Sequence, residues 1–172
     1  MLGKWLKSAV TALALLLAVS FAVSPAHAEE KTIKIGVPGA HSGNLAAYGL
    51  PPLNAARLVV KYINEQGGVN GIKVELLAQD DQCKPEMATN VATKLLSDGA
   101  VVVMGHICSG PTFAALPTYS NTVLMSPSST VPELTTSGKF PTFFRTIAKD
   151  DDQAALAVQQ AVDKLGAKRI AI

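Results

Sequence analysis

Stretches of β-branched residues and stretches with helical spacing alternate along this chain, which predicts strands and helices in turn. Residues 32–37 suit a strand that ends at Pro38-Gly39. Apolar residues then recur at helical spacing as far as Gly67-Gly68, and Pro51-Pro52 suit the first turn of that helix, where amide protons lack partners. Further strands are expected at 72–78, 100–104, 122–125 and 143–145, and further helices at 85–98 and 113–116. Such alternation predicts βαβ units, a parallel sheet and an α/β fold.

The end of the chain repeats the pattern once more. Three aspartates at 150–152 suit the positive end of a helix dipole, and Gly166 suits the helix end. The stripe expected to be buried consists of Ala155, Val158, Val162 and Leu165. Residues 168–172 then begin a strand whose neighbours are not in the sequence. We therefore expect this chain to be the front part of a longer protein.

The first residues have the pattern of a secretory signal peptide. Lys4 and Lys7 precede an uncharged run at 8–23, and the small residues Ala26 and Ala28 suit a signal-peptidase site. The run is short for a membrane span, although a retained N-terminal anchor is the alternative. We expect cleavage after residue 28, and neither cysteine lies near enough for a lipid anchor.

Composition and charge exclude several classes of protein. With 48% hydrophobic and 16% charged residues, the chain is too apolar to be disordered. Fifteen Lys and Arg oppose 13 Asp and Glu, which leaves no basic excess for nucleic acid. The spacing of the three histidines suggests no metal site, and the motifs of nucleotide-binding loops and serine hydrolases are missing. We expect no cofactor and no enzyme activity.

The two cysteines lie in loops that follow neighbouring predicted strands. Export would carry Cys83 and Cys108 into an oxidising compartment, where a disulfide between them is expected. The alternative is an exported hydrolase in which Cys108 is a nucleophile and His106 its base. Residues so close on a tight turn rarely reach the geometry that this pair needs.

Hydroxyl groups gather in loops at the carboxyl ends of the predicted strands, where ligands bind in open parallel sheets. Ser109 lies where a helix begins and could bind an anion or simply cap that helix. Ser126, Ser128, Ser129 and Thr130 form a second group, which is either a binding loop or an ordinary polar loop. Tyr48 could cover a ligand or pack on its own loop.

Several of these segments together resemble a known family. They are His41-Ser42-Gly43, Ala47-Tyr48-Gly49, and residues 64–71, 80–83, 105–109 and 127–135. In them the chain resembles the periplasmic Leu/Ile/Val-binding proteins of branched-chain amino acid ABC transporters, from about residue 33 to 172. Family members are about twice as long, and their Ala-Ala-Thr turn is Ser128-Ser129-Thr130 here.

The resemblance implies a type I periplasmic-binding-protein fold, truncated at the start of its second lobe. Residues 29–148 would form the first ligand-binding lobe and 149–172 the beginning of the second. The complete protein would be a periplasmic monomer that binds a free aliphatic amino acid between its lobes and delivers it to a membrane permease. An amino-acid or amide sensor on the same fold is the alternative.

The resemblance also implies roles for single residues. Ser109 would bind the ligand carboxylate, and Tyr48 would line the pocket. Ile107 would lie near the ligand side chain. Ser128, Ser129 and Thr130 would share the carboxylate and the ammonium group.

Overall fold

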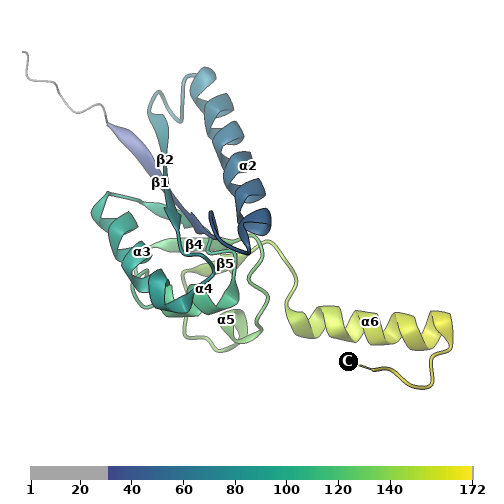
Figure 1. Ribbon diagram of the computed structural model, residues 1–172. Helices are drawn as coiled ribbons and strands as arrows, with labels where there is room; N and C mark the ends of the chain where they lie inside the picture. The colour runs from purple at the N-terminus through teal and green to yellow at the C-terminus, as the bar shows by residue number, and fades with distance from the viewer. Residues whose placement is uncertain (1–30, 172) are drawn as a thin grey trace, which may run out of the picture. The chain divides into compact units, whose positions relative to one another are not determined.

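Five parallel strands form the centre of the fold (Figure 1). The structure is a computed structural model and describes residues 31–171, so the predicted signal peptide at 1–28 lies outside the described residues. The strands are β1 (Thr32–Gly39), β2 (Lys73–Asp80), β3 (Val102–Met104), β4 (Val123–Ser126) and β5 (Phe143–Arg145). Their order is β2-β1-β3-β4-β5, and every neighbouring pair is parallel. The predicted α/β fold is therefore confirmed.

The helices connect the strands in the predicted alternation. They are α2 (Ala46–Glu65), α3 (Pro85–Ser97), α4 (Ser109–Ala115), α5 (Glu133–Thr136) and α6 (Asp150–Leu165). α5 is a single turn in a segment whose composition predicted only a loop.

The start of α2 differs from the prediction. The helix begins at Ala46, so Pro51 and Pro52 lie inside it and not in its first turn. Without N–H groups, these prolines cannot donate to the carbonyls of Ala47 and Tyr48, which weakens this end of the helix. Gly49 allows the close approach that the early start requires, because a Cβ there would lie 1.9 Å from the carbonyl oxygen of Ala40.

The two faces of the sheet are packed differently. On one face, residues from β3, β4 and β5 join α3, α4 and α5 in the main core. Leu95, Val103 and Leu124 are completely buried there. On the other face lies α2, and Met104 and Phe144 remain 46% and 47% exposed. The apolar run at 100–104 is not buried on both faces, because alternate residues of β3 point to opposite sides and only one side is covered.

α6 has the predicted length and ends as predicted, with Gly166 in the left-handed conformation at φ 63°. Its apolar stripe, which needs a packing partner, is not buried in the described residues. No residue of α6 is buried, and Leu165 is 82% exposed. Nor do residues 168–171 form a strand. An apolar stripe becomes buried only when another element packs on it. The spacing of residues within the helix indicates the stripe but does not provide that packing partner. The boundary between lobes at residue 148 stays a prediction.

Candidate functional site

The strand order places a crevice between β1 and β3. After β1 the chain turns to one side of the sheet and enters α2. After β3 it turns to the other side and enters α4, which packs beside α3. Loops that diverge in this way leave room for a ligand at the carboxyl ends of the strands. The candidate residues predicted from the sequence lie in the segments that follow β1, β3 and β4. The parallel strands bring all three segments to the same edge of the sheet.

A cavity of about 350 Å³ lies at this edge. Three of the predicted site residues line it, namely Tyr48, Ile107 and Ser128. The rest of the lining consists of Leu45, Pro52, Cys108 and Pro127. Tyr48 is 72% exposed, so its ring lies at the surface and is not packed into its own loop. The cavity wall is mostly apolar with a few polar groups, which is typical of small-molecule sites.

Ser109 and Thr130 come from different loops and are joined by a hydrogen bond. The amide of Thr130 donates to Oγ of Ser109 at 3.2 Å, and the amide of Val131 donates to the same oxygen at 3.4 Å. Ser109 therefore connects the end of the loop after β3 (residues 105–108, the β3 loop) to the loop after β4 (residues 127–132, the β4 loop). Its oxygen has accepted two hydrogen bonds, and its own proton remains available to an acceptor.

Ser109, Ser129 and Thr130 are not among the residues that line the cavity, and Ser129 differs from the other two in its burial. Its side chain is fully buried, and its hydroxyl is within hydrogen-bond distance of Thr112, Ser126 and the carbonyl of His106. Its amide donates to Ser126. In this structure its side chain therefore supports the β4 loop from below and does not line the cavity.

A buried ionisable pair lies beneath the loop that carries Ile107 and Ser109. Nδ1 of His106 is 2.5 Å from Oδ2 of Asp81, and both side chains are completely buried. The hydroxyl of Tyr119 lies 3.4 Å from the opposite ring nitrogen of His106. Burial, and the nearby negative charge of Asp81, raise the pKa of Tyr119, so this phenol keeps its proton.

The same loop is also held covalently. Cys83 and Cys108 form the predicted disulfide, with their Cα atoms 5.6 Å apart. The amide of Cys83 also donates to Oδ1 of Asp81 at 2.7 Å. Because the sulfur of Cys108 is bonded to Cys83, it offers no thiolate, and the nucleophile that a thiol hydrolase requires is missing from this pair.

Arg145, at the end of β5, holds the far side of the β4 loop. Its guanidinium donates to the carbonyls of Ser129, Val131 and Pro132, at 3.2, 3.0 and 3.4 Å, and also contacts the hydroxyl of Thr135. The sequence contained no signal for the roles of Arg145, Asp81 or Tyr119, since each acts through a partner at least ten residues away in the chain.

The loop after β1 is ordered around Asp80. Its carboxylate accepts hydrogen bonds from the amides of His41 and Gln82 and from the hydroxyl of Ser42. Burial opposes ionisation of this carboxyl, but the hydrogen bonds prevail and lower the pKa of Asp80. Burial lowers the pKa of His41, and the charges of Asp80 and Asp81 only partly compensate.

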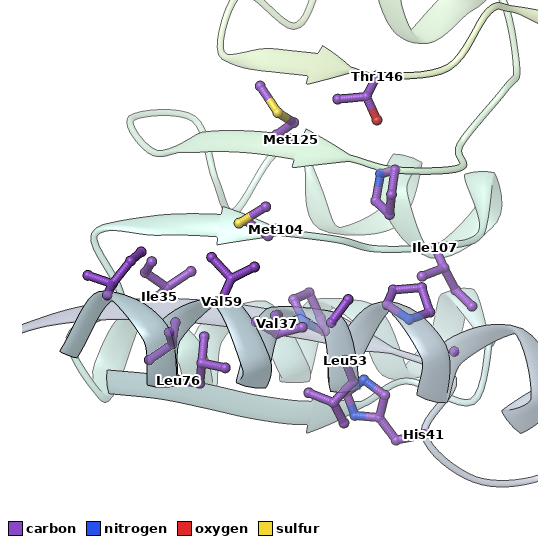
Figure 2. Close-up of a pocket in the computed structure, with 18 residues that line it drawn as sticks. Ile35, Val37, His41, Leu53, Val59, Leu76, Met104, Ile107, Met125 and Thr146 are labelled. Atoms are coloured by element: carbon purple, nitrogen blue, oxygen red, sulfur yellow. The ribbon is translucent and has the colours of Figure 1, made fainter. Parts of the chain in front are cut away.

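A second, apolar cavity of about 390 Å³ lies between α2 and the open face of the sheet (Figure 2). Figure 2 shows aliphatic and methionine side chains pointing into it, among them Ile35, Leu76 and Met104. His41 and Thr146 are at its edge and Ile107 is shared with the first cavity. Its lining offers almost no partner for a charged ligand, so we take the smaller cavity as the candidate site.

Residues 31–171 contain no cluster of three or more His, Cys, Asp or Glu side chains that could hold a metal ion. No helix among them is both long and apolar enough for a membrane span. The candidate site instead presents hydroxyls, backbone groups and an apolar wall, which suit a small polar molecule with an aliphatic part.

Comparison with known proteins agrees with this fold. Residues 32–172 match the family model described as periplasmic binding protein. The chain belongs to this family. Among curated relatives, the Leu/Ile/Val-binding protein of Citrobacter freundii is 40% identical over 144 residues, which cover 83% of this chain and 39% of the relative. The Leu/Ile/Val/Thr-binding protein of Salmonella typhimurium is 38% identical over 160 residues, which cover 91% of this chain and 44% of the relative.

Solved structures of periplasmic binding proteins have the same fold. The substrate-binding protein LivJ of the branched-chain amino acid transporter of Streptococcus pneumoniae, in complex with isoleucine, matches with TM-score 0.75 and 34% identity. That match covers 80% of this chain and 40% of LivJ. An ABC transporter substrate-binding protein of Desulfitobacterium hafniense in complex with Leu matches with TM-score 0.62 and 34% identity. This match covers 78% of this chain and 40% of that protein. The chain thus spans about two fifths of the length of these relatives.

Proposed function

We propose that this chain is the front part of the substrate-binding component of an ABC importer, and that the complete protein binds free aliphatic amino acids. The observation that carries the proposal is the convergence of Tyr48, Ile107 and Ser128 on one cavity, next to the paired Ser109 and Thr130. The isoleucine and leucine complexes of similar proteins support the choice of ligand. The binding protein would release the amino acid unchanged to a membrane permease.

The roles of the site residues follow from their hydrogen bonds. Ser109 has a proton left to donate, so it would bind the ligand carboxylate. The hydroxyl of Thr130 has no hydrogen-bond partner among the described residues and would bind a charged group of the ligand. Tyr48 and Ile107 would cover the aliphatic side chain, because both line the cavity and offer it apolar surface. Ser129 would contribute by holding the loop.

The test is calorimetry on the complete protein with leucine, isoleucine, valine and small polar amino acids. Ser109→Ala and Thr130→Ala each remove a hydrogen bond to a charged group, which is worth about 1.5–3 kcal/mol and weakens binding roughly 10- to 150-fold. Ser120→Ala changes an exposed serine and is the matched control. Absence of binding by any amino acid, or unchanged affinity in both variants, contradicts the proposal.

We also propose that residues 1–28 direct export to the periplasm and are removed. The motive is the order of Lys4, Lys7, the uncharged run and the Ala26-x-Ala28 site. The N-terminal sequence of the exported protein should begin at Glu29. A mature protein that still contains Trp5 contradicts this proposal without affecting the proposed ligand.

A further inference from the structure

The backbone carbonyl of His106 joins the β3 loop to the β4 loop. It accepts a hydrogen bond from the hydroxyl of Ser126 at 2.6 Å and another from the hydroxyl of Ser129 at 3.2 Å. The oxygen of Ser126 in turn accepts hydrogen bonds from the amides of Ser128 and Ser129. The position of the β4 loop therefore depends on the orientation of the peptide unit that carries the carbonyl of His106.

The side chain of His106 is held at both ring nitrogens. Nδ1 lies 2.5 Å from Oδ2 of Asp81, and the other oxygen of this carboxylate accepts a hydrogen bond from the amide of Cys83 at 2.7 Å. Nε2 lies 3.4 Å from the hydroxyl oxygen of Tyr119. The side chains of His106, Asp81 and Tyr119 are completely buried, so bulk water does not compete for these contacts.

The direction of these hydrogen bonds follows from the phenol of Tyr119. Burial and the nearby charge of Asp81 raise its pKa, so the phenol keeps its proton. A buried O–H group needs an acceptor, and the structure provides Nε2 of His106. Nε2 therefore carries no proton, and Nδ1 donates the ring proton to Asp81. Partners on opposite sides thus fix the ring in one tautomer and one orientation.

We propose that Tyr119 and Asp81 are positioning residues for ligand binding that act through His106. The inference rests on the proposed function of binding free amino acids. The described residues that line the candidate cavity include neither Tyr119 nor Asp81. Both instead fix the ring of His106, and with it the backbone that leads to Ile107 and carries the carbonyl bound by the β4 loop. If the ring could turn, ligand binding would also have to order the two loops, which lowers the affinity.

The experiment removes the hydroxyl of Tyr119 alone. Tyr119→Phe keeps the buried ring, and calorimetry on the complete protein should show leucine binding weakened about 5-fold or more. Val74→Ala is the control for lost stability, because Val74 is buried near the amino end of β2, at the opposite end of the strand from the candidate site. It should change the affinity for leucine less than about 2-fold. Tyr62→Phe makes the same substitution at an exposed tyrosine and should leave the affinity unchanged.

A second measurement tests whether Tyr119 acts through His106. Nitrogen NMR of protein labelled at histidine should find the ring proton of His106 on Nδ1, and Tyr119→Phe should shift the Nε2 resonance, because that nitrogen loses its donor. His106→Asn keeps a donor for Asp81 but has no group in the position of Nε2. In this background, Tyr119→Phe should weaken leucine binding no further, as expected for two residues that act as one unit.

Three results overturn the inference. The first is an unchanged affinity for leucine in Tyr119→Phe, or a loss that Val74→Ala equals, because Tyr119 then contributes to stability alone. The second is a ring proton on Nε2 of His106 in the wild type. The third is a further loss of affinity when Tyr119→Phe is added to His106→Asn. If the wild-type protein binds no amino acid, the proposed function itself fails, so the two failures are distinguishable.

Discussion

Nδ1 of His106 lies 2.5 Å from Oδ2 of Asp81, and neither side chain is exposed to solvent. Asp81 is two residues before Cys83, and His106 is two residues before Cys108. The buried pair and the disulfide therefore join the same two loops side by side, one by a hydrogen bond and the other covalently. Both connections hold the turn that carries Ile107 and Ser109.

The buried pair should contribute strongly to stability. Removing one partner leaves the other polar group buried and unpaired, so Asp81→Ala should lower the free energy of unfolding by about 1–3 kcal/mol. Asp81→Asn should cost less, because its amide oxygen can still accept from Nδ1 of His106. Denaturant unfolding with the disulfide intact measures both values. A loss below about 1 kcal/mol in Asp81→Ala would show that the pair is dispensable.

Cys83 and Cys108 should be joined as a disulfide in the exported protein. This bond should stabilise the protein independently of the buried pair of Asp81 and His106. The sequence separation of its cysteines is 25 residues, which corresponds to about 3 kcal/mol in the chain-entropy model. The variant with Cys83→Ala and Cys108→Ala should lose this amount in denaturant unfolding. Non-reducing peptide mapping of the wild type should find one linked pair. Complete alkylation of both cysteines without a reducing agent would contradict the prediction.

Arg145 should keep the β4 loop in its binding conformation. Arg145→Ala removes charge-assisted hydrogen bonds to three carbonyls, and we expect the free energy of unfolding to fall by about 1.5–3 kcal/mol. The amides of Thr130 and Val131 should then exchange hydrogen faster. Arg145→Lys is the comparison variant, since a lysine retains the charge without the planar fork and should restore only part of the protection. Unchanged exchange in Arg145→Ala would show that the loop holds itself.

Stability should fall with pH below about 6.5, and His41 should cause part of this fall. Burial lowers the pKa of His41 from 6.5 in the folded protein. The unfolded chain therefore binds a proton at higher pH than the folded chain does, which favours unfolding as the pH decreases. His41→Gln should flatten the dependence of the unfolding free energy on pH below 6.5. If the slope of this variant equals that of the wild type, His41 is not responsible.

Protonation of Asp80 should also lower the stability of the folded protein as the pH falls, but at lower pH than for His41. Its pKa lies below 3.8 in the folded protein, so its contribution to stability is complete above that value and is lost as the pH falls through the lowered pKa. Asp80→Asn should remove this acid-dependent loss while leaving the dependence near neutral pH in place.

The order and type of the main elements could be predicted because they depend on local pattern. The strands from Thr32 to Arg145 carry their own β-branched or apolar runs, and each long helix carries its own spacing and end signals. The disulfide was predictable for a similar reason, since Cys83 and Cys108 follow parallel strands whose carboxyl ends lie at one edge of the sheet. The two strands, β2 and β3, were expected to be neighbours, but β1 lies between them. The elements with weak local signals were placed wrongly or missed, namely the start of α2 and the single turn α5.

The tertiary structure decided what each site residue can do. The sequence marked Ser109, Ser128, Ser129 and Thr130 as hydroxyl-bearing residues at the right edge of the sheet. It could not show that Ser129 is buried, that Asp81 pairs with His106, or that Arg145 holds the β4 loop. Local pattern reports propensity and periodicity, whereas burial and the partner of each donor and acceptor are set by residues distant in the chain. For the same reason the free proton of Ser109 could be assigned only after the loops were seen together.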